Sequence, residues 1–141
     1  MHPLRLLPLL GGLVVAASAA PSAMRFDFGA GPVADGFTPV APDTLYTPAR
    51  GHGLLAAQGI RSSASDCPDP LRSDALVSDR AFAFVVDLPP GNYDVTVLLG
   101  DPSAPSSTTV KAESRRLMIE TASVAAGATE SRSFTVNIRT P

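Results

Sequence analysis

The side chains that could carry out nucleophilic catalysis are few in this chain. A serine or cysteine nucleophile needs a histidine to take its proton, a carboxylate to orient that histidine, and hydrogen-bond donors for the oxyanion. The sequence holds one cysteine, Cys67, and two histidines, His2 and His52. His2 lies in a leader-like N-terminal segment. We therefore expect no catalytic residues, with Cys67 an incidental thiol and His52 packed or hydrogen-bonded at a strand edge.

Four aspartates lie close together in one polar stretch of the sequence. They are Asp66, Asp69, Asp74 and Asp79. Oxygen-rich loops can hold a calcium ion, but the spacing of these side chains fits no calcium-loop motif. We therefore predict solvated or turn-capping aspartates, no metal ligands and no cofactor, and a structural calcium ion stays open as the alternative.

A sugar-binding site needs an aromatic side chain on which a ring can stack and a few planar polar groups that reach the ring hydroxyls. In segments that we expect to be loops, the residues of these types are Tyr46, Arg72, Asp79 and Phe37. Tyr93 falls on the inner face of a predicted strand and is interpreted as a packing residue. The chain has no tryptophan and two tyrosines. The alternative therefore stays open that the four residues hold loops together.

The first twenty residues have the layout of a secretory signal peptide. Two polar residues near the start precede an apolar stretch over 6–15, and small residues occupy 16–20. The apolar stretch is about half as long as a membrane-spanning helix needs. We predict a signal peptide over 1–20 that is cut after Ala19. The protein is then expected to be secreted or periplasmic, without a membrane anchor.

Size and charge bound the remaining segment, 21–141. Roughly 120 residues suit one domain with its own core. The formal net charge of the chain is −2, and Lys111 is its one lysine. A mildly acidic protein with so few lysines is a poor partner for nucleic acid or an anionic membrane surface, so we predict neither.

Alternating apolar residues predict that this domain is built from strands. Phe82–Leu88 and Tyr93–Leu99 each place their apolar residues on one face. Pro90 and Gly91 between them suit a type II turn, so we expect a hairpin. Further strands are expected at 24–28, 52–57, 108–113, 117–120 and 134–139.

The other segments have the composition of loops. The proline- and glycine-rich stretch 21–49 is expected to wrap over the scaffold as ordered loop outside its one strand. The polar stretch 58–78 is expected to be loop with at most one helical turn. Many short strands separated by turns indicate an all-β, antiparallel β-sandwich of jelly-roll type.

Several motifs follow one another along the chain. Among them are Arg25-Phe26-Asp27-Phe28-Gly29, Pro42-Asp43-Thr44-Leu45-Tyr46, Arg50-Gly51-His52-Gly53, Asp69-Pro70-Leu71-Arg72, Pro90-Gly91-Asn92-Tyr93-Asp94-Val95-Thr96-Val97 and Thr109-Val110-Lys111-Ala112-Glu113-Ser114-Arg115-Arg116-Leu117. In this order they resemble the N-terminal domain of bacterial rhamnogalacturonan acetylesterases, which belong to the GDSL-type esterases. The resemblance implies a galactose-binding-like β-sandwich placed before a GDSL-type hydrolase domain. It also implies pectin deacetylation as the activity of the parent enzyme, and related sandwiches carry structural calcium.

The sequence departs from this family at places that matter for chemistry. The family has aromatic residues at the position of His52 and near Leu54, so any sugar stacking supplied there is weakened. The esterase serine sits in a Gly-Asp-Ser block after a strand, and in Gly100-Asp101-Pro102-Ser103 a proline takes its place. The family's catalytic histidine comes in an Asp-x-x-His block, which this sequence lacks. We therefore interpret Ser103 as a turn residue.

The sequence leaves three functions open for this chain. The first is the non-catalytic N-terminal sandwich of a secreted rhamnogalacturonan acetylesterase, with the hydrolase domain and pectic polysaccharide as partners. The alternative is a stand-alone secreted carbohydrate-binding module. A third reading, a small self-sufficient esterase, requires acetate release that depends on Ser103.

The resemblance also implies that the sequence stops at Pro141 before the closing strand of the sandwich. The domain at 21–141 is then expected to be incomplete at its C-terminus and to lack its last strand. First and last strands lie side by side in this class, so the strand over 24–28 is expected to have an open edge. An open apolar edge promotes self-association.

Overall fold

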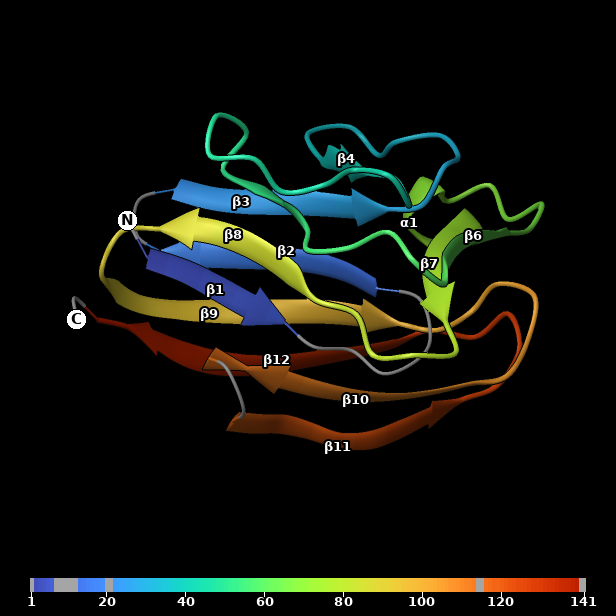
Figure 1. The fold of residues 1–141 in the computed structure, drawn as a ribbon. Helices are drawn as coiled ribbons and strands as arrows, with labels where there is room; N and C mark the ends of the chain where they lie inside the picture. Colours follow the sequence, from blue (N-terminus) through green and yellow to red (C-terminus); the bar gives the residue numbers. More distant parts are fainter. Residues whose placement is uncertain (1, 7–12, 20–21, 114–115, 140–141) are drawn as a thin grey trace.

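The computed structural model describes residues 2–6, 13–19, 22–113 and 116–139, and these form an all-β sandwich. Two five-stranded sheets lie face to face, in the orders β11-β10-β1-β8-β5 and β12-β9-β2-β3-β4 (Figure 1). A two-stranded ladder of β6 and β7 lies at one end. The predicted antiparallel sandwich is confirmed, and the parallel pair of β3 and β4 is an exception to it.

The elements have the following bounds along the chain. They are β1 His2–Leu6, β2 Leu13–Ala19, β3 Ser22–Phe28, β4 Thr38–Val40, β5 His52–Leu54, β6 Ile60–Ala64, α1 Pro70–Ser73, β7 Asp74–Ser78, β8 Phe84–Leu88, β9 Gly91–Leu99, β10 Ser106–Ala112, β11 Arg116–Val124 and β12 Glu130–Ile138. Most expected strands are therefore confirmed, β5 being shorter and β11 longer than the sequence predicted. In the described part of the chain, no helix is long and apolar enough to span a membrane.

The core lies between the inner faces of the two sheets. Phe26 and Phe28 on β3 meet Phe84 on β8, which belongs to the other sheet. The Phe84 ring lies edge-on to both, with centroid separations of 5.0 and 4.9 Å, a favourable geometry for aromatic pairs. These rings pack the two layers together. On β9, Tyr93 and alternate residues after it are buried, as the alternation predicts.

The hairpin predicted from β8 and β9 is wrong, because the two strands belong to different sheets. β8 pairs with β1 and β5, whereas β9 pairs with β2 and β12. A hairpin within one sheet and an arch between two sheets bury the same alternate residues, so the alternation alone cannot separate them. The link consists of Pro89 and Pro90, which offer no amide donor to a ladder. The Tyr93 hydroxyl donates to the Pro89 carbonyl at 2.7 Å.

The loop predicted over 58–78 is also wrong. β6 and β7 form an antiparallel ladder there, and only the predicted helical turn, α1, is confirmed. All five residues of β7 are buried, although the strand begins with Asp74 and ends with Ser78. Because of these polar ends and the serines of β6, the apolar segment 75–77 is too short to be predicted as a strand from the sequence.

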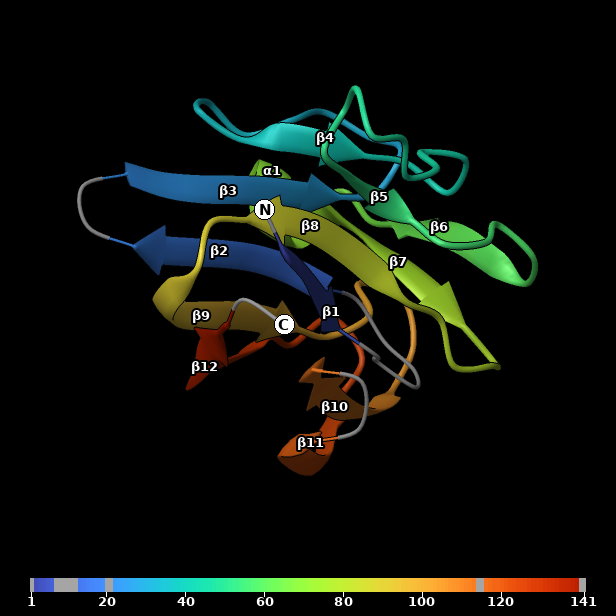
Figure 2. The same ribbon diagram turned by 60° about the vertical axis from the view of Figure 1, so that its left-hand side comes forward.

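Residues 2–6 and 13–19 add one strand to each sheet. β1 lies between β8 and β10, and β2 lies between β3 and β9 (Figure 2). In the complete chain β3 pairs with β2 on one side and β4 on the other. The open edge is expected for the domain at 21–141, which lacks β2, and it stays a prediction. The signal peptide stays a prediction, and residues 1, 7–12, 20 and 21 lie outside the described part.

Candidate functional site

Most of the polar contacts that join separate loops lie at one end of the sandwich, which we call the α1 end. Strands β3 and β9 end there, β12 begins there, and α1 lies beside them (Figure 1). The α1 end comprises the loop 29–37, the turn 69–74, the connection 100–105 and the segment 125–129. These four segments are far apart in the sequence, and the two sheets bring their polar side chains to one surface.

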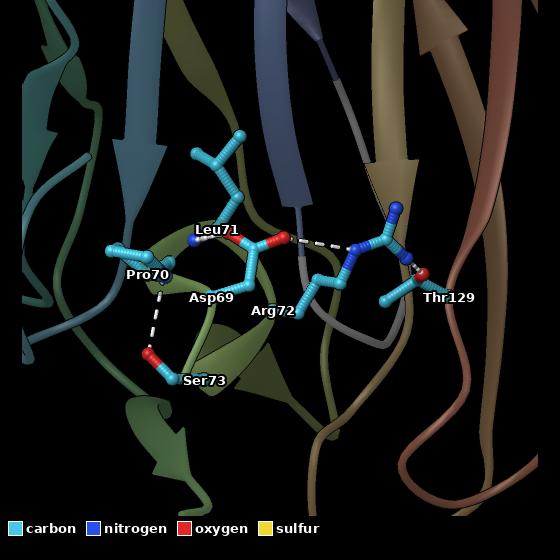
Figure 3. A network of polar contacts seen from close by, with 6 residues as sticks. All are labelled: Asp69, Pro70, Leu71, Arg72, Ser73 and Thr129. Atoms are coloured by element: carbon cyan, nitrogen blue, oxygen red, sulfur yellow. Dashed lines mark hydrogen bonds and ion pairs between the residues drawn. The ribbon is translucent and has the colours of Figure 1, made fainter. Parts of the chain in front are cut away.

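Arg72 ties α1 to the segment before β12 (Figure 3). Asp69 caps α1, since its carboxylate accepts from the Leu71 amide at 3.0 Å, and Pro70 follows at the start of the helical turn. The same carboxylate accepts from Nε of Arg72 at 3.1 Å. Arg72 also donates through Nη1 to the Thr129 hydroxyl. The guanidinium is half exposed, so this network leaves Arg72 accessible to a ligand.

Asp101 is the centre of a second, fully satisfied group in the connection after β9. It is 6% exposed and accepts from the Ser63 hydroxyl at 2.5 Å and from the Ser103 amide at 2.9 Å. The Ser103 hydroxyl and the Ala104 amide also donate to it. Burial alone raises the pKa of Asp101, but the bonds from Ser63, Ser103 and Ala104 outweigh it and hold the pKa below its usual value.

Asp27 and Asp74 are buried at the same end without such a supply of donors. They are 3% and 4% exposed. Asp27 accepts from the Ala34 amide at 2.9 Å, and Asp74 accepts from the Gly31 amide at 2.6 Å. In both residues the second oxygen, Oδ1, is buried and has no hydrogen-bond partner. The loop 29–37 is thus held to the sandwich by two carboxylates that are each half satisfied.

The pKa values of Asp27 and Asp74 are shifted in the direction opposite to that of Asp101. Burial raises the pKa of Asp27, and the charges of Asp74 and Asp69 raise it further against the lowering effect of the Ala34 amide. Burial also raises the pKa of Asp74, against the Gly31 amide. Both groups therefore bind a proton more readily than an exposed aspartate does.

A second polar cluster lies on β5 and β8, apart from the α1 end. The Tyr46 hydroxyl donates to the Asp87 carboxylate at 2.7 Å, and this bond raises the pKa of Tyr46. His52 packs on Phe26, with a centroid separation of 5.0 Å. Burial lowers the pKa of His52, although a hydrogen bond to the Arg50 backbone opposes this. The predicted role of His52 as a packing residue at a strand edge agrees with this position.

Two open hollows are found on the described surface. One, of about 450 Å³, is lined by residues 105–107 and 123–125, where β10 begins and β11 ends. The other, of about 340 Å³, lies over β9 and β12 beside Asp94 and Phe134. In the second hollow, hydroxyls bond to one another across the strands, as in the 2.9 Å contact of Thr96 and Ser133. Sequence analysis did not single out either surface, because each forms only when strands distant in sequence pair.

The sequence model of one protein family, described as β-agarase/YXIM esterase-like, galactose-binding domain-like, matches residues 24–138. The chain belongs to this family. The family domain therefore begins within β3 and ends with β12, and it includes every segment of the α1 end. The match supports the galactose-binding-like fold that the resemblance implied.

The chain is also similar to an esterase of Bacillus subtilis (strain 168), named uncharacterized esterase YxiM. The two are 31% identical over 100 residues, which are 68% of this chain and 26% of the relative. The chain thus matches about a quarter of the relative's length. No solved structure matched the chain significantly.

The structure separates the four residues predicted to bind sugar. Arg72 lies at the α1 end, and half-buried Phe37 lies in the loop 29–37 of the same end. Tyr46 is bonded to Asp87 on β8. Asp79 follows β7 and is strongly exposed, 4.0 Å from Arg61. Sugar binding by these residues stays a prediction, and only Arg72 and Phe37 of the four share one surface.

The described residues show no arrangement suited to metal or nucleophilic chemistry. Among them, no group of three or more His, Cys, Asp or Glu side chains could hold a metal ion. The aspartates considered for calcium have separate partners, since Asp69 contacts Arg72 and Asp74 accepts from Gly31. The Ser103 hydroxyl contacts Asp101 and Ser63. Among its contacts in the described part, this serine has no histidine, and the pKa of Asp101 is lowered, which makes that carboxylate a weak proton acceptor.

Proposed function

We propose that this chain is the non-catalytic, galactose-binding-like β-sandwich of a secreted rhamnogalacturonan acetylesterase, with a GDSL-type hydrolase domain as its partner. The observation that carries the proposal is the match to the galactose-binding family over 24–138, together with an esterase relative of which only 26% is matched. Most of that relative therefore lies outside the part resembling this chain. The hydroxyl of Ser103, which has no histidine among its contacts in the described part, supports a non-catalytic role.

In this proposal, the α1 end is the surface that contacts pectic polysaccharide. The half-exposed guanidinium of Arg72 offers planar donors suited to sugar hydroxyls and to uronic acid carboxylates. The hollow of about 450 Å³ nearby has room for part of one sugar ring. The aromatic supply is limited to Phe37 in the adjoining loop, which favours weak binding over the tight stacking of a tryptophan platform.

Binding is tested by titrating the chain with rhamnogalacturonan oligosaccharides, followed by calorimetry and by NMR shifts of backbone amides. Homogalacturonan oligosaccharides serve as the control ligand. We expect shifts confined to the α1 end, and weaker binding after Arg72→Ala. The matched control is Arg132→Ala, which removes a similarly exposed arginine paired with Glu130 on the outer sheet surface. Absence of binding to any pectic fragment, or equal effects of the two variants, would contradict the proposed surface.

Catalysis is tested separately with the purified chain and acetylated rhamnogalacturonan. We expect no acetate release above the uncatalysed rate, because no histidine contacts the Ser103 hydroxyl in the described part of the chain. Turnover that is lost in Ser103→Ala would instead establish the chain as a small esterase. Binding without turnover agrees with both the esterase-domain proposal and a stand-alone binding module. Adding the hydrolase part of a related esterase and measuring its association with this chain distinguishes them.

A further inference from the structure

The leader-like segment occupies central positions in both sheets. β2 pairs antiparallel with β3 from Val14 with Asp27 to Ala19 with Ser22, and with β9 from Leu13 with Leu99 to Ser18 with Asp94. β1 pairs with β8 from His2 with Leu88 to Leu6 with Phe84. It meets β10 at Leu6 with Ala112.

The part of the chain that the family model matches contains the strands on either side of these positions, which we call the rims. It does not contain β1 and β2 themselves. The match begins at residue 24, after both β1 and β2. β3 and β9 have no pairing with each other, and neither do β8 and β10, because β2 and β1 stand between them. Each sheet of the matched part is therefore split by a slot one strand wide. The rims of such a slot carry backbone donors and acceptors that must be paired.

The predicted signal-peptidase site lies between β2, which occupies one slot, and β3, which forms a side of that slot. β2 ends at Ala19 and β3 begins at Ser22, and the predicted cut follows Ala19. A cut there separates residues 2–19 from the sandwich without removing any rim residue. Both strands run antiparallel to their neighbours, so the segment is held by ladders on both sides rather than by its covalent junction alone.

We propose that residues 22–138 form a strand acceptor, whose two slots hold β1 and β2 in this chain and bind the segment 2–19 when it is no longer covalently attached. Recognition is by β-strand addition, in which backbone hydrogen bonds from β3 and β9 to β2, and from β8 and β10 to β1, give affinity. The occupant is this segment, in two strands, with one entering each sheet. The inference does not depend on the proposed esterase function.

The test starts from the complete chain. A protease recognition sequence is inserted at residues 20 and 21, the chain is folded, and the junction is then cut. We expect residues 2–19 to remain with the sandwich through gel filtration under native conditions and to leave in denaturant. We also expect amides of β3 and β9 to keep their hydrogen-exchange protection after the cut.

Exchange with labelled peptide measures the specificity of the slots. Fluorescent peptide 2–19 is added to the cut protein, beside a control peptide carrying Val15→Pro and Ala17→Pro. Val15 pairs with Phe26 and Val97 in the centre of β2, and proline removes a ladder donor and restricts the backbone. We expect the unaltered peptide to exchange in and the control to bind at least about tenfold more weakly, equal to 1.4 kcal/mol.

Three results would overturn the proposal. The first is release of residues 2–19 on cutting while the remainder keeps the melting curve and amide protection of the uncut chain, which would show that no slot had been filled. The second is release followed by a dimer or larger species with β3 and β9 protected. That result would show that a second copy, not this segment, is the preferred occupant. Equal exchange of the two peptides would also contradict strand addition.

Discussion

Asp101 and the pair Asp27 and Asp74 are buried to a similar degree at the same end of the sandwich, yet their pKa values are displaced in opposite directions. Burial acts on all three. The difference is the number of donors, because Asp101 receives bonds from two hydroxyls and two amides, whereas Asp27 and Asp74 each receive one amide. Donor supply, rather than depth, decides the direction in which the pKa of a buried carboxyl is shifted here.

The two sites also hold different kinds of structure. Asp101 organises a tight turn and joins it to Ser63 on β6, so its bonds stabilise a surface of the α1 end. Asp27 and Asp74 instead hold the backbone of the loop 29–37 against the core.

Gly29→Ala is expected to destabilise the protein most. A Cβ at this position would lie 2.2 Å from Oδ2 of Asp74, and the backbone φ of +147° is strained for any side chain. We expect a loss of about 3 kcal/mol in the free energy of unfolding, measured by urea titration. The control is Gly36→Ala in the same loop, where φ is +79° but no atom lies within 4 Å. This control should cost about 1 kcal/mol. Equal losses would mean that Asp74 is not tightly held.

Asparagine substitutions at Asp101 and Asp27 separate the two sites directly. Asp101→Asn turns one acceptor oxygen into a donor that faces other donors, so we expect a loss of about 2 kcal/mol at neutral pH. Asp27→Asn keeps an oxygen for the Ala34 amide and replaces a buried, half-satisfied carboxyl with a neutral amide, so we expect a change between zero and about 1 kcal/mol of stabilisation. Chemical denaturation of both variants at pH 7 measures the contrast, and a larger loss at Asp27 would reverse the comparison.

We expect Asp27 and Asp74 to change the stability with pH in one direction and Asp101 to change it in the opposite direction. For Asp27 and Asp74 the folded pKa is above the ordinary value of 3.8, so their stabilising contribution is complete below that value and is lost as pH rises through the raised pKa. For Asp101 the folded pKa is below 3.8, so its contribution is complete above 3.8 and is lost as pH falls through the lowered pKa.

Urea titrations from pH 7 down to about pH 3 follow these contributions in the variants. As pH falls from 7 through the raised pKa values of Asp27 and Asp74, the parent protein gains stability. We expect the double variant Asp27→Asn, Asp74→Asn to lack part of this gain. We expect Asp101→Asn to show a smaller fall in stability below about pH 4 than the parent. Identical pH profiles for all three proteins would show that none of these carboxyls has a displaced pKa.

The hydroxyls of Tyr93 and Tyr46 are neutral donors, and we expect their removal to change the free energy of unfolding least. Tyr93 is buried and donates to the Pro89 carbonyl, whereas half-buried Tyr46 donates to the Asp87 carboxylate, which solvent reaches. We expect Tyr93→Phe to cost about 1 kcal/mol. We expect Tyr46→Phe to cost less, since water replaces the lost donor at Asp87. Thermal unfolding by circular dichroism measures both. A larger effect at Tyr46 would mean that Asp87 is less accessible than its position indicates.

Local pattern was enough to predict the sandwich, but not its connections. The alternation from Tyr93 to Leu99 gave the inner face of β9 correctly. The same alternation could not say whether β8 and β9 share a sheet, because both solutions bury identical side chains. β7 escaped prediction because its burial comes from packing on both faces, which a short run between Asp74 and Ser78 does not reveal.

The sites were less predictable than the fold for a physical reason. Asp74 accepts from Gly31, 43 residues away, and Ser63 donates to Asp101 across 38 residues. Such partners follow from strand order and register, which the sequence alone did not fix. The residues chosen for sugar binding were selected by type, and the fold then placed Tyr46 and Asp79 away from Arg72.

The proline link described above constrains how the sandwich can open. Pro89 and Pro90 join the two layers across two residues at one end, whereas at the α1 end the crossing from β9 to β10 takes residues 100–105. The layers can therefore separate farther at the α1 end than at the proline end. Water that enters the core during a transient opening should enter from the α1 end, beside the partly satisfied carboxylates, and the interior near Tyr93 should be the last to be wetted.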